Sequence, residues 1–140
     1  MSDTTDLLAV LSASSVFGGL PRRQLKTIAR YSRAVSVPAG TRLVTEGDAG
    51  SEFCIVVTGG CRVERRGVEL RTLDPGDSFG EISVIDGEPR TATVTAVADT
   101  ELVVLSQPDF DHAVKVAPDL GRALLTQLCS QIRRLDAEAD

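Results

Sequence analysis

Short apolar runs with a period of two fill the middle of the chain, and Gly, Pro and Asp separate them. The runs recur at a spacing of roughly eight to twelve residues, which is typical of an antiparallel β-sandwich or barrel. In CRVERRG, Val63 alternates with charged neighbours, which predicts one face toward the core and one toward solvent. A mainly β region is therefore predicted over residues 34–106, with the runs AVSVPAG, TRLVTEGDAG, EFCIVVTGG, CRVERRG, VELRTLDPGD and TATVTAVADTELVVLS.

Helices are predicted before these strands, over residues 1–33. The segment MSDTTDLLAVLS has the spacing of a short helix, with Thr5 or Asp6 as its N-cap. A second helix is predicted to begin at Pro21, because proline suits the first helical position. Its basic face is either a solvated surface or a partner surface, and consists of Arg22, Arg23, Lys26, Arg30 and Arg33.

Two further helices are predicted after the strands, over residues 107–136. Ser106 has the position of an N-cap, and Pro108 enters the first turn. A second helix start follows at Pro118. From there apolar residues recur at three- and four-residue steps, which predicts an amphipathic helix of about five turns ending in the acidic tail DAEAD. The apolar stripe consists of Leu120, Leu124, Leu128, Ile132 and Leu135. For Leu124, Leu128 and Leu135 a core role is expected, with a partner or dimer surface as the alternative.

Length and charge limit the classes of protein to which the chain can belong. The chain has 140 residues and a net charge of −5, which suits one domain and argues against broad nucleic-acid or membrane-surface binding. Three cysteines, no CxxC pair and no signal peptide fit a reducing compartment. Cys54, in EFCIVV, is interpreted as a core residue of a strand. Since the apolar runs are too short to cross a bilayer, a single cytoplasmic domain is expected.

The residues that most enzymes of β-barrel folds need are missing from the sequence. A metal site requires a cluster of His and carboxylate ligands, and His112 is the single histidine of the chain. No Gly-x-Ser-x-Gly nucleophile motif is present either. We therefore expect no catalytic activity, no metal and no cofactor.

FGEISVIDGEPRTATVTA, residues 79–96, interrupts the β region with something other than a plain turn. Gly80 lets the backbone approach a ligand closely, and residues 81–85 have the potential for a short helix whose first N–H groups suit an anion. Arg90 offers a planar fork of donors that matches phosphate oxygens, and Glu81 offers acceptors for sugar hydroxyls. These residues fit a phosphorylated sugar, and they fit equally a Glu81–Arg90 salt bridge that closes a surface loop.

The run F-G-E-I-S, six turn residues and then R-T-A-T resembles the phosphate-binding cassette of cyclic-nucleotide-binding domains. This family includes the bacterial catabolite activator, cyclic-nucleotide-dependent protein kinases and gated channels. The resemblance covers nearly the whole chain, from SSVFGGLPRRQLKTIA through VPAGTRLVTEGDAGSEFCIVVTGGCRV and LDPGDSFGE to the helices over residues 108–135. It implies an antiparallel β-roll or jelly-roll barrel with N-terminal helices, a cassette over residues 79–92 with a short helix, and C-terminal hinge and lid helices.

The resemblance also implies roles for the residues of the cassette. Glu81 would hold the ribose 2′-hydroxyl, and Arg90 would pair with the cyclic phosphate. Thr91 would add its hydroxyl, while Gly80 and Ala92 would add backbone N–H groups.

The remaining contacts implied by the resemblance come from the cassette helix, the strands and the last helix. Ile82 and Ser83 would contribute backbone contacts from the short helix. The nucleotide base would lie against apolar side chains of two strands and be capped from the last helix. The residues expected at the base are Val63, Leu70, Gln131 and Arg134.

The ligand implied by the resemblance is cAMP or cGMP. Thr91 suits cGMP because its hydroxyl can reach the guanine amino group, but members that bind cAMP also carry Thr or Ser there. We favour cAMP, since it is the commoner bacterial ligand of this family.

The expected output is a signal passed through the C-terminal helices to a partner protein. Catabolite activators carry a helix-turn-helix domain after the long helix, and this chain stops where that domain would begin, so no direct DNA binding is expected. The alternatives are a stand-alone sensor, favoured by Met1 and the polar tail, and a regulatory domain of a larger protein. A monomer and a helix-mediated homodimer both remain open, as does a scaffold of the same fold without a nucleotide.

Overall fold

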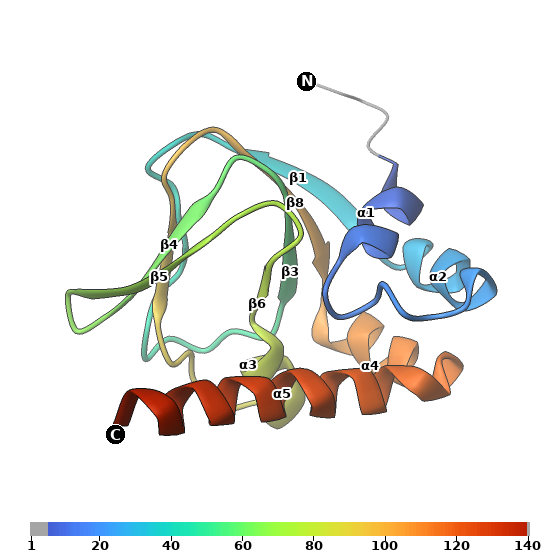
Figure 1. Ribbon diagram of the computed structural model, residues 1–140. Helices are drawn as coiled ribbons and strands as arrows, with labels where there is room; N and C mark the ends of the chain where they lie inside the picture. The colour runs from blue at the N-terminus through green and yellow to red at the C-terminus, as the bar shows by residue number, and fades with distance from the viewer. Residues whose placement is uncertain (1–5, 140) are drawn as a thin grey trace.

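The computed structural model of the protein describes residues 6–139. Helices at both ends flank a central block of strands, as Figure 1 shows. In chain order the elements are α1 (Leu7–Ala13), α2 (Arg22–Ala29), β1 (Arg33–Val37), β2 (Arg42–Val44), β3 (Phe53–Thr58), β4 (Cys61–Arg65), β5 (Val68–Leu73), β6 (Ser78–Phe79), α3 (Glu81–Asp86), β7 (Thr93–Ala96), β8 (Thr100–Leu105), α4 (Gln107–Val116) and α5 (Pro118–Ala139).

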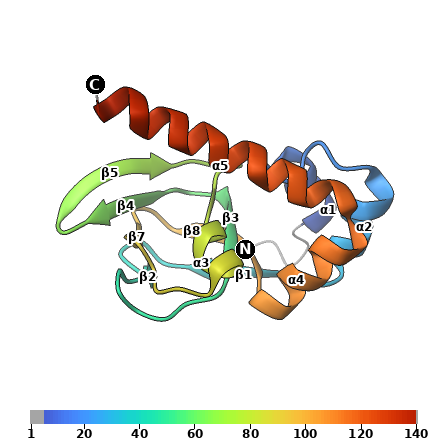
Figure 2. The same ribbon diagram turned by 90° about the horizontal axis from the view of Figure 1, so that it is seen from below.

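The strands form two four-stranded antiparallel sheets, with the orders β1-β8-β3-β6 and β2-β7-β4-β5. The chain crosses between the sheets several times, and the two sheets close into a roll. The predicted fold class, an antiparallel β-roll with flanking helices, is confirmed. Figure 2 shows the roll from below, with α5 running along it from the α4 end toward the β4–β5 hairpin.

Two apolar cores hold the molecule together. One lies between the helices and β3 and β8, where Phe53 packs edge-on against Phe17 and tilted against Phe110, with ring centroids 5.6 and 5.4 Å apart. The other fills the roll and includes Val63 and Leu102. The cassette residues that follow β6 lie next to both cores, so their backbone is anchored on two sides.

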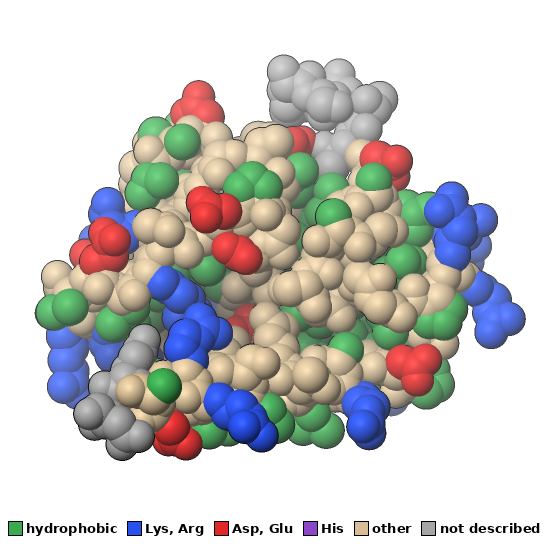
Figure 3. Space-filling view, viewed as in Figure 1, with side chains coloured by type: hydrophobic (Ala, Val, Ile, Leu, Met, Phe, Trp, Pro, Cys, Tyr) green, Lys and Arg blue, Asp and Glu red, His purple; other side chains and the backbone are tan. Residues whose placement is uncertain are grey.

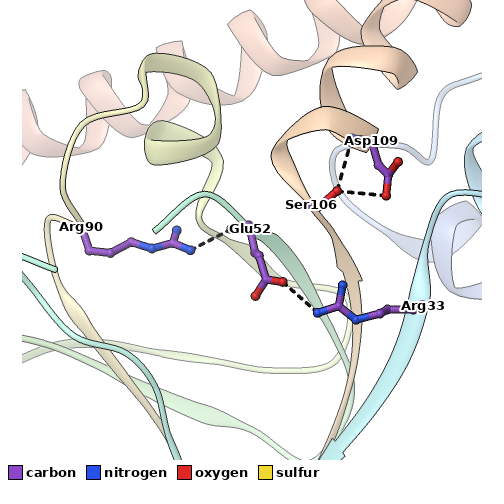
Figure 4. Close-up of polar contacts among 5 residues, drawn as sticks. All are labelled: Arg33, Glu52, Arg90, Ser106 and Asp109. Carbon is purple, nitrogen blue, oxygen red and sulfur yellow. Dashed lines mark hydrogen bonds and ion pairs between the residues drawn. The ribbon is translucent and has the colours of Figure 1, made fainter. Parts of the chain in front are cut away.

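Side-chain caps fix where the flanking helices begin. Asp6 Oδ1 accepts a hydrogen bond from Ala9 N at 3.1 Å, as predicted for α1, while the alternative cap Thr5 lies outside the described residues. Ser106 Oγ accepts from Asp109 N at 3.3 Å and caps α4 (Figure 4). Pro21 precedes α2 as its N-cap instead of being its first residue, so the prediction was one residue early. The prediction that α5 begins at Pro118 is confirmed.

The apolar stripe of α5 is core only in its first half. Leu124 is buried as predicted, together with Leu120, whereas the core role predicted for Leu135 is wrong, since Leu135 is 63% and its neighbour Ile132 58% exposed. The reason is geometric, since α5 extends beyond the helical layer and passes along the roll (Figure 1). The helix also continues through the predicted acidic tail to Ala139.

Charged side chains gather at separate places on the surface. On the face seen in Figure 3, Lys and Arg side chains stand out over α2, along α5 and at the end of the β4–β5 hairpin.

The first strand begins at Arg33, and the last strand, β8, ends at Leu105. The division of the chain into functional parts stays a prediction. Among the described residues, no helix has the length and the apolar character that a bilayer crossing needs.

Candidate functional site

A cavity of about 330 Å³ opens between the roll, α3 and α5. Figure 3 shows the surface recessed between the roll and α5, with Lys and Arg side chains beside the recess. Every residue predicted to bind the ligand contributes to the wall of this one cavity. The lining residues are Val44, Val63, Arg65, Leu70, Arg71, Phe79, Gly80, Glu81, Ile82, Ser83, Arg90, Thr91, Ala92, Val94, Gln131, Arg134 and Leu135.

Two glycines in the left-handed conformation shape the cassette. Gly80 has φ +91° and is the N-cap of α3, and Gly87 has φ +72° and ends it by donating its N–H to Ser83 O at 2.9 Å. Such φ values favour glycine because a Cβ would be strained there. The tight ends keep α3 to six residues. As a result, Glu81 at the start of α3 and Arg90 ahead of β7 line the same cavity.

Arg90 is buried, with 7% of its surface exposed. Its Nη2 donates to the backbone oxygen of Glu52 at 3.1 Å, as Figure 4 shows. Its backbone N donates to Asp48 O at 2.9 Å, and its backbone O accepts from Gly47 N at 2.8 Å. Among the described residues, Arg90 Nε and Nη1 have no hydrogen-bond partner. A buried guanidinium with free donors is costly unless an anion satisfies it.

Two glycines pack directly against this guanidinium. A Cβ added to Gly50 would collide with Arg90 Nε and lie 2.9 Å from Cζ, and one added to Gly80 would lie 2.9 Å from Nη1. Gly50 and Glu52 were missed as site residues from the sequence, where Gly50 is one of many turn glycines. The side chain of Glu52 in turn pairs with Arg33 at 2.8 Å, in an exposed ion pair (Figure 4).

Glu81 is buried at 4% exposure. Its Oε1 accepts a hydrogen bond from Gln131 Nε2 on α5 at 3.0 Å. Within the described part of the chain, its Oε2 is buried without a partner. Glu81 and Arg90 form no ion pair there, whereas Glu52 pairs with Arg33 and Glu64 with Arg62. The alternative of a loop closed by a Glu81–Arg90 salt bridge is therefore wrong.

Outside the cassette the cavity wall combines apolar side chains with arginines. Val63 is buried and Leu70 is 46% exposed, and with Arg134 they line the cavity as predicted. Arg65 and Arg71 also line it but were not predicted, and Arg65 Nε donates to Thr91 O of the cassette at 2.9 Å. The strand period could have found Arg65, since it lies two residues after Val63 and thus on the same face. Arg71 is the cross-strand partner of Val63, a pairing that only the register of the sheet reveals.

Cys54 lies behind the site on β3, paired with Phe79 of β6. It is buried, as predicted. Burial raises the pKa of its thiol to about 12, and the neighbouring Glu52 carboxylate adds to this, while Arg90 and Arg33 act in the opposite direction. The thiol is therefore protonated at neutral pH and is a packing residue, not a nucleophile.

Residues of the kind that bind metals do not gather in the described chain. No group of three or more His, Cys, Asp or Glu side chains is placed to share an ion within residues 6–139. His112 is exposed on α4 and contacts the ring of Tyr31, with ring centroids 4.6 Å apart. The cavity thus offers hydrogen-bond donors, one carboxylate and apolar walls, which suit an anionic ligand with hydroxyl groups and a flat apolar part.

Known proteins share both this sequence pattern and this fold. The model of the cyclic nucleotide-binding domain family matches residues 34–116. The cyclic AMP receptor protein of Thermus thermophilus is 31% identical over 135 residues, which are 93% of this chain and 62% of that protein. The crystal structure of the Thermus thermophilus catabolite activator protein superposes with a TM-score of 0.84 at 32% identity, covering 91% of this chain and 62% of that one.

Eukaryotic kinase regulatory subunits are similar as well. The regulatory subunit of the cAMP-dependent protein kinase of Aspergillus niger is 28% identical over 116 residues, or 81% of this chain and 28% of that protein. The cAMP co-crystal structure of the Toxoplasma gondii regulatory domain has a TM-score of 0.70 at 32% identity, covering 76% of this chain and 42% of that one. The chain thus spans less than two thirds of the length of these relatives. With the family match extending over more than half of its length, the chain belongs to the cyclic nucleotide-binding domain family.

Proposed function

We propose that the chain is a non-catalytic regulatory module that binds a cyclic nucleotide in the cavity between the roll, α3 and α5. One observation carries this proposal. Arg90 and Glu81 are both buried in the wall of the cavity, and each has polar atoms without a partner among the described residues. A cyclic nucleotide has a phosphate that satisfies the first and a ribose hydroxyl that satisfies the second.

The proposed contacts follow from where the residues lie. Arg90 Nε and Nη1 take the phosphate oxygens, together with the Thr91 hydroxyl and the backbone N–H groups of Gly80 and Ala92. Glu81 Oε2 accepts from the ribose 2′-hydroxyl. A hydrogen bond from arginine to phosphate contributes about 1.5–3 kcal/mol, whereas micromolar binding requires about 8 kcal/mol. The apolar walls and backbone donors, including those of Ile82 and Ser83, must therefore supply the rest.

We favour cAMP as the ligand because the relatives described above are named for it or crystallised with it. A specific observation supports cGMP as a second candidate. Arg71 and Arg134 line the cavity together with Val63 and Leu70, the residues predicted at the base. Arginine is a good partner for the O6 and N7 acceptors of guanine, whereas the amino group of adenine needs an acceptor.

The proposed output is a change in the position of α4 and α5. Ligand binding can favour one arrangement of these helices only if it binds that arrangement more tightly. The exposed apolar residues of α5, among them Leu125, Ile132 and Leu135, are a candidate surface for a partner protein or a second copy of the chain. A scaffold without a ligand fits less well, because it would leave Arg90 buried with unpaired donors. The identity of the partner and a cytoplasmic location stay predictions.

Isothermal titration calorimetry with cAMP and cGMP tests the proposal. We expect binding of at least one, and Arg90→Ala should weaken it about 10- to 150-fold, the range that one charged hydrogen bond represents. Arg22→Ala, on the exposed basic face of α2, is the matched control and should bind like the wild type. Arg71→Leu should weaken cGMP more than cAMP if guanine is the base. The absence of binding of either nucleotide at about 100 μM would rule out the proposal.

A further inference from the structure

A single side-chain hydrogen bond joins the last helix to the carboxylate of the site. Gln131 Nε2, on the second half of α5, donates to Glu81 Oε1, on the first turn of α3, at 3.0 Å. Among the described residues, no other hydrogen bond links a side chain of α3 to a side chain of α5. The two residues are 50 positions apart in the sequence, so the contact exists only when α5 lies on the cassette.

This hydrogen bond gives the two carboxylate oxygens of Glu81 different environments. Oε1 is taken by Gln131, while Oε2 is buried without a partner among the described residues. A carboxylate has about four acceptor positions, so one donor does not exclude a second. It does hold the carboxylate plane in one orientation, because the bond fixes the position of Oε1. The contact on Oε1 therefore leaves Oε2 as the acceptor for a second donor.

We propose that Gln131 is a positioning residue for the ribose, which acts on the ligand through Glu81 and does not contact the base. The inference rests on the proposed function, because it assigns a role toward the same nucleotide. In this role Gln131 orients Glu81 so that Oε2 accepts from the ribose 2′-hydroxyl, and it docks α5 over the cavity before the ligand binds. This differs from the contact with the base expected from the sequence.

The surroundings of Gln131 support this assignment. Its amide donor points to Glu81, the residue proposed to hold the sugar, whereas Val63, Leu70 and Arg71, which line the same cavity, are the residues proposed for the base. In the first half of α5, Leu120 and Leu124 are anchored in the core. Past them Leu125, Ile132 and Leu135 are exposed, and this polar contact is a tie between the second half of the helix and the cassette. The same hydrogen bond thus affects both the recognition of the ligand and the position of α5.

Ligands that differ only in the 2′-hydroxyl test the role directly. Calorimetry compares cAMP with 2′-deoxy-cAMP, or the corresponding guanine pair if cGMP proves to be the ligand. The wild type should prefer the ribose form. Gln131→Met keeps the length and removes the donor, so it should weaken the ribose form about tenfold and change the deoxy form less than about twofold. Gln131→Lys restores a donor to Glu81 and should recover the preference, while Ser130→Ala, an exposed neighbour, should leave both affinities unchanged.

The outcomes separate this inference from the proposed function. An equal loss of both ligands in Gln131→Met would overturn the positioning role and leave nucleotide binding intact. Failure of the wild type to bind either nucleotide would overturn the proposed function and the inference with it. Amide hydrogen exchange without ligand gives a second readout. Residues 128–135 should exchange faster in Gln131→Met than in Ser130→Ala, and equal exchange in the two variants would contradict the docking of α5 by this contact.

Discussion

At the scale of single residues, the arginine of the site is held in place before any ligand arrives. The backbone oxygen of Glu52 fixes Nη2, and the backbones of Gly50 and Gly80 lie directly against the guanidinium, where a Cβ would collide with it. Ordering a long side chain at a binding site costs about 0.5–1.5 kcal/mol. Because Arg90 is already ordered in the folded protein, this cost arises during folding and does not reduce the affinity for the ligand. The ligand therefore binds to donors that are already oriented.

Gly50→Ala should therefore reduce ligand affinity without unfolding the protein. The new Cβ would collide with the Arg90 side chain and displace its guanidinium, because the three nearest atoms all belong to that side chain. We expect about tenfold weaker cyclic nucleotide binding by calorimetry, with a change in the free energy of unfolding below about 1 kcal/mol. Gly19→Ala is the control, since its Cβ would meet nothing within 4 Å. Equal affinity in the two variants would contradict the close packing of Gly50 on Arg90.

At the scale of elements, α5 combines two halves with different surroundings. Its beginning packs in the core through Leu120 and Leu124, while its end lies along the cavity and exposes Ile132 and Leu135. A helix with little packing over its second half depends more on its own helix propensity. Its stability then sets how firmly the cavity is covered.

Gly121→Ala should stabilise α5, because Gly121 lies in the first turns of the helix and its Cβ would meet nothing within 4 Å. Alanine in place of glycine in a helix adds about 0.5–1 kcal/mol. Urea unfolding followed by circular dichroism should show a higher midpoint with an unchanged slope. A lower midpoint would mean that the glycine is needed for a contact of α5.

Several elements could be predicted from the sequence because their signals are local. Alternation over two residues located the strands, and Asp6 and Ser106 marked helix starts through their own backbone contacts. The end of the buried stripe on α5 was not predictable in this way. Periodicity shows which side of a helix is apolar, and it does not show where the neighbouring layer of helices stops.

The residues of the site also differ in whether they could be predicted from local sequence signals. The cassette residues, Glu81 and Arg90 among them, are close in sequence, so their spacing was informative. Gly50 and Arg71 reach the cavity through tertiary packing and through the register of β4 with β5. Register depends on pairing between strands, which a single sequence does not reveal. The contact between Gln131 and Glu81 was missed for the same reason, since it requires α5 to lie on α3.

At the scale of the whole molecule, stability should fall in alkaline solution because of its buried thiols. The pKa of Cys54 is raised to about 12, and burial also raises that of Cys61. The folded state thus keeps protons that the unfolded chain releases near the ordinary thiol pKa of 9.0. The stabilisation is complete below this pH and is lost as the pH rises toward the folded value.

Urea titrations at pH 8 and 10.5 measure this effect. The free energy of unfolding of the wild type should decrease between the two, and Cys54→Ala should decrease less, although it starts lower because of the cavity it creates. Cys129→Ala is the control, since Cys129 is exposed. An equal decrease in the wild type and Cys54→Ala would show that other groups govern the alkaline limit.

The length of α5 can amplify a small displacement of the helix at the cavity into a larger displacement at its C-terminal end. The helix has 22 residues and meets α4 at Ala117, whose φ of −127° and ψ of 84° break the helical path. At 1.5 Å per residue, Ala139 lies about 33 Å from this joint and Gln131 about 21 Å from it. A rigid rod pivoting at Ala117 would turn a displacement of about 1 Å at Gln131 into about 1.6 Å at Ala139. A partner that contacts the C-terminal end of α5 would therefore sense the larger displacement.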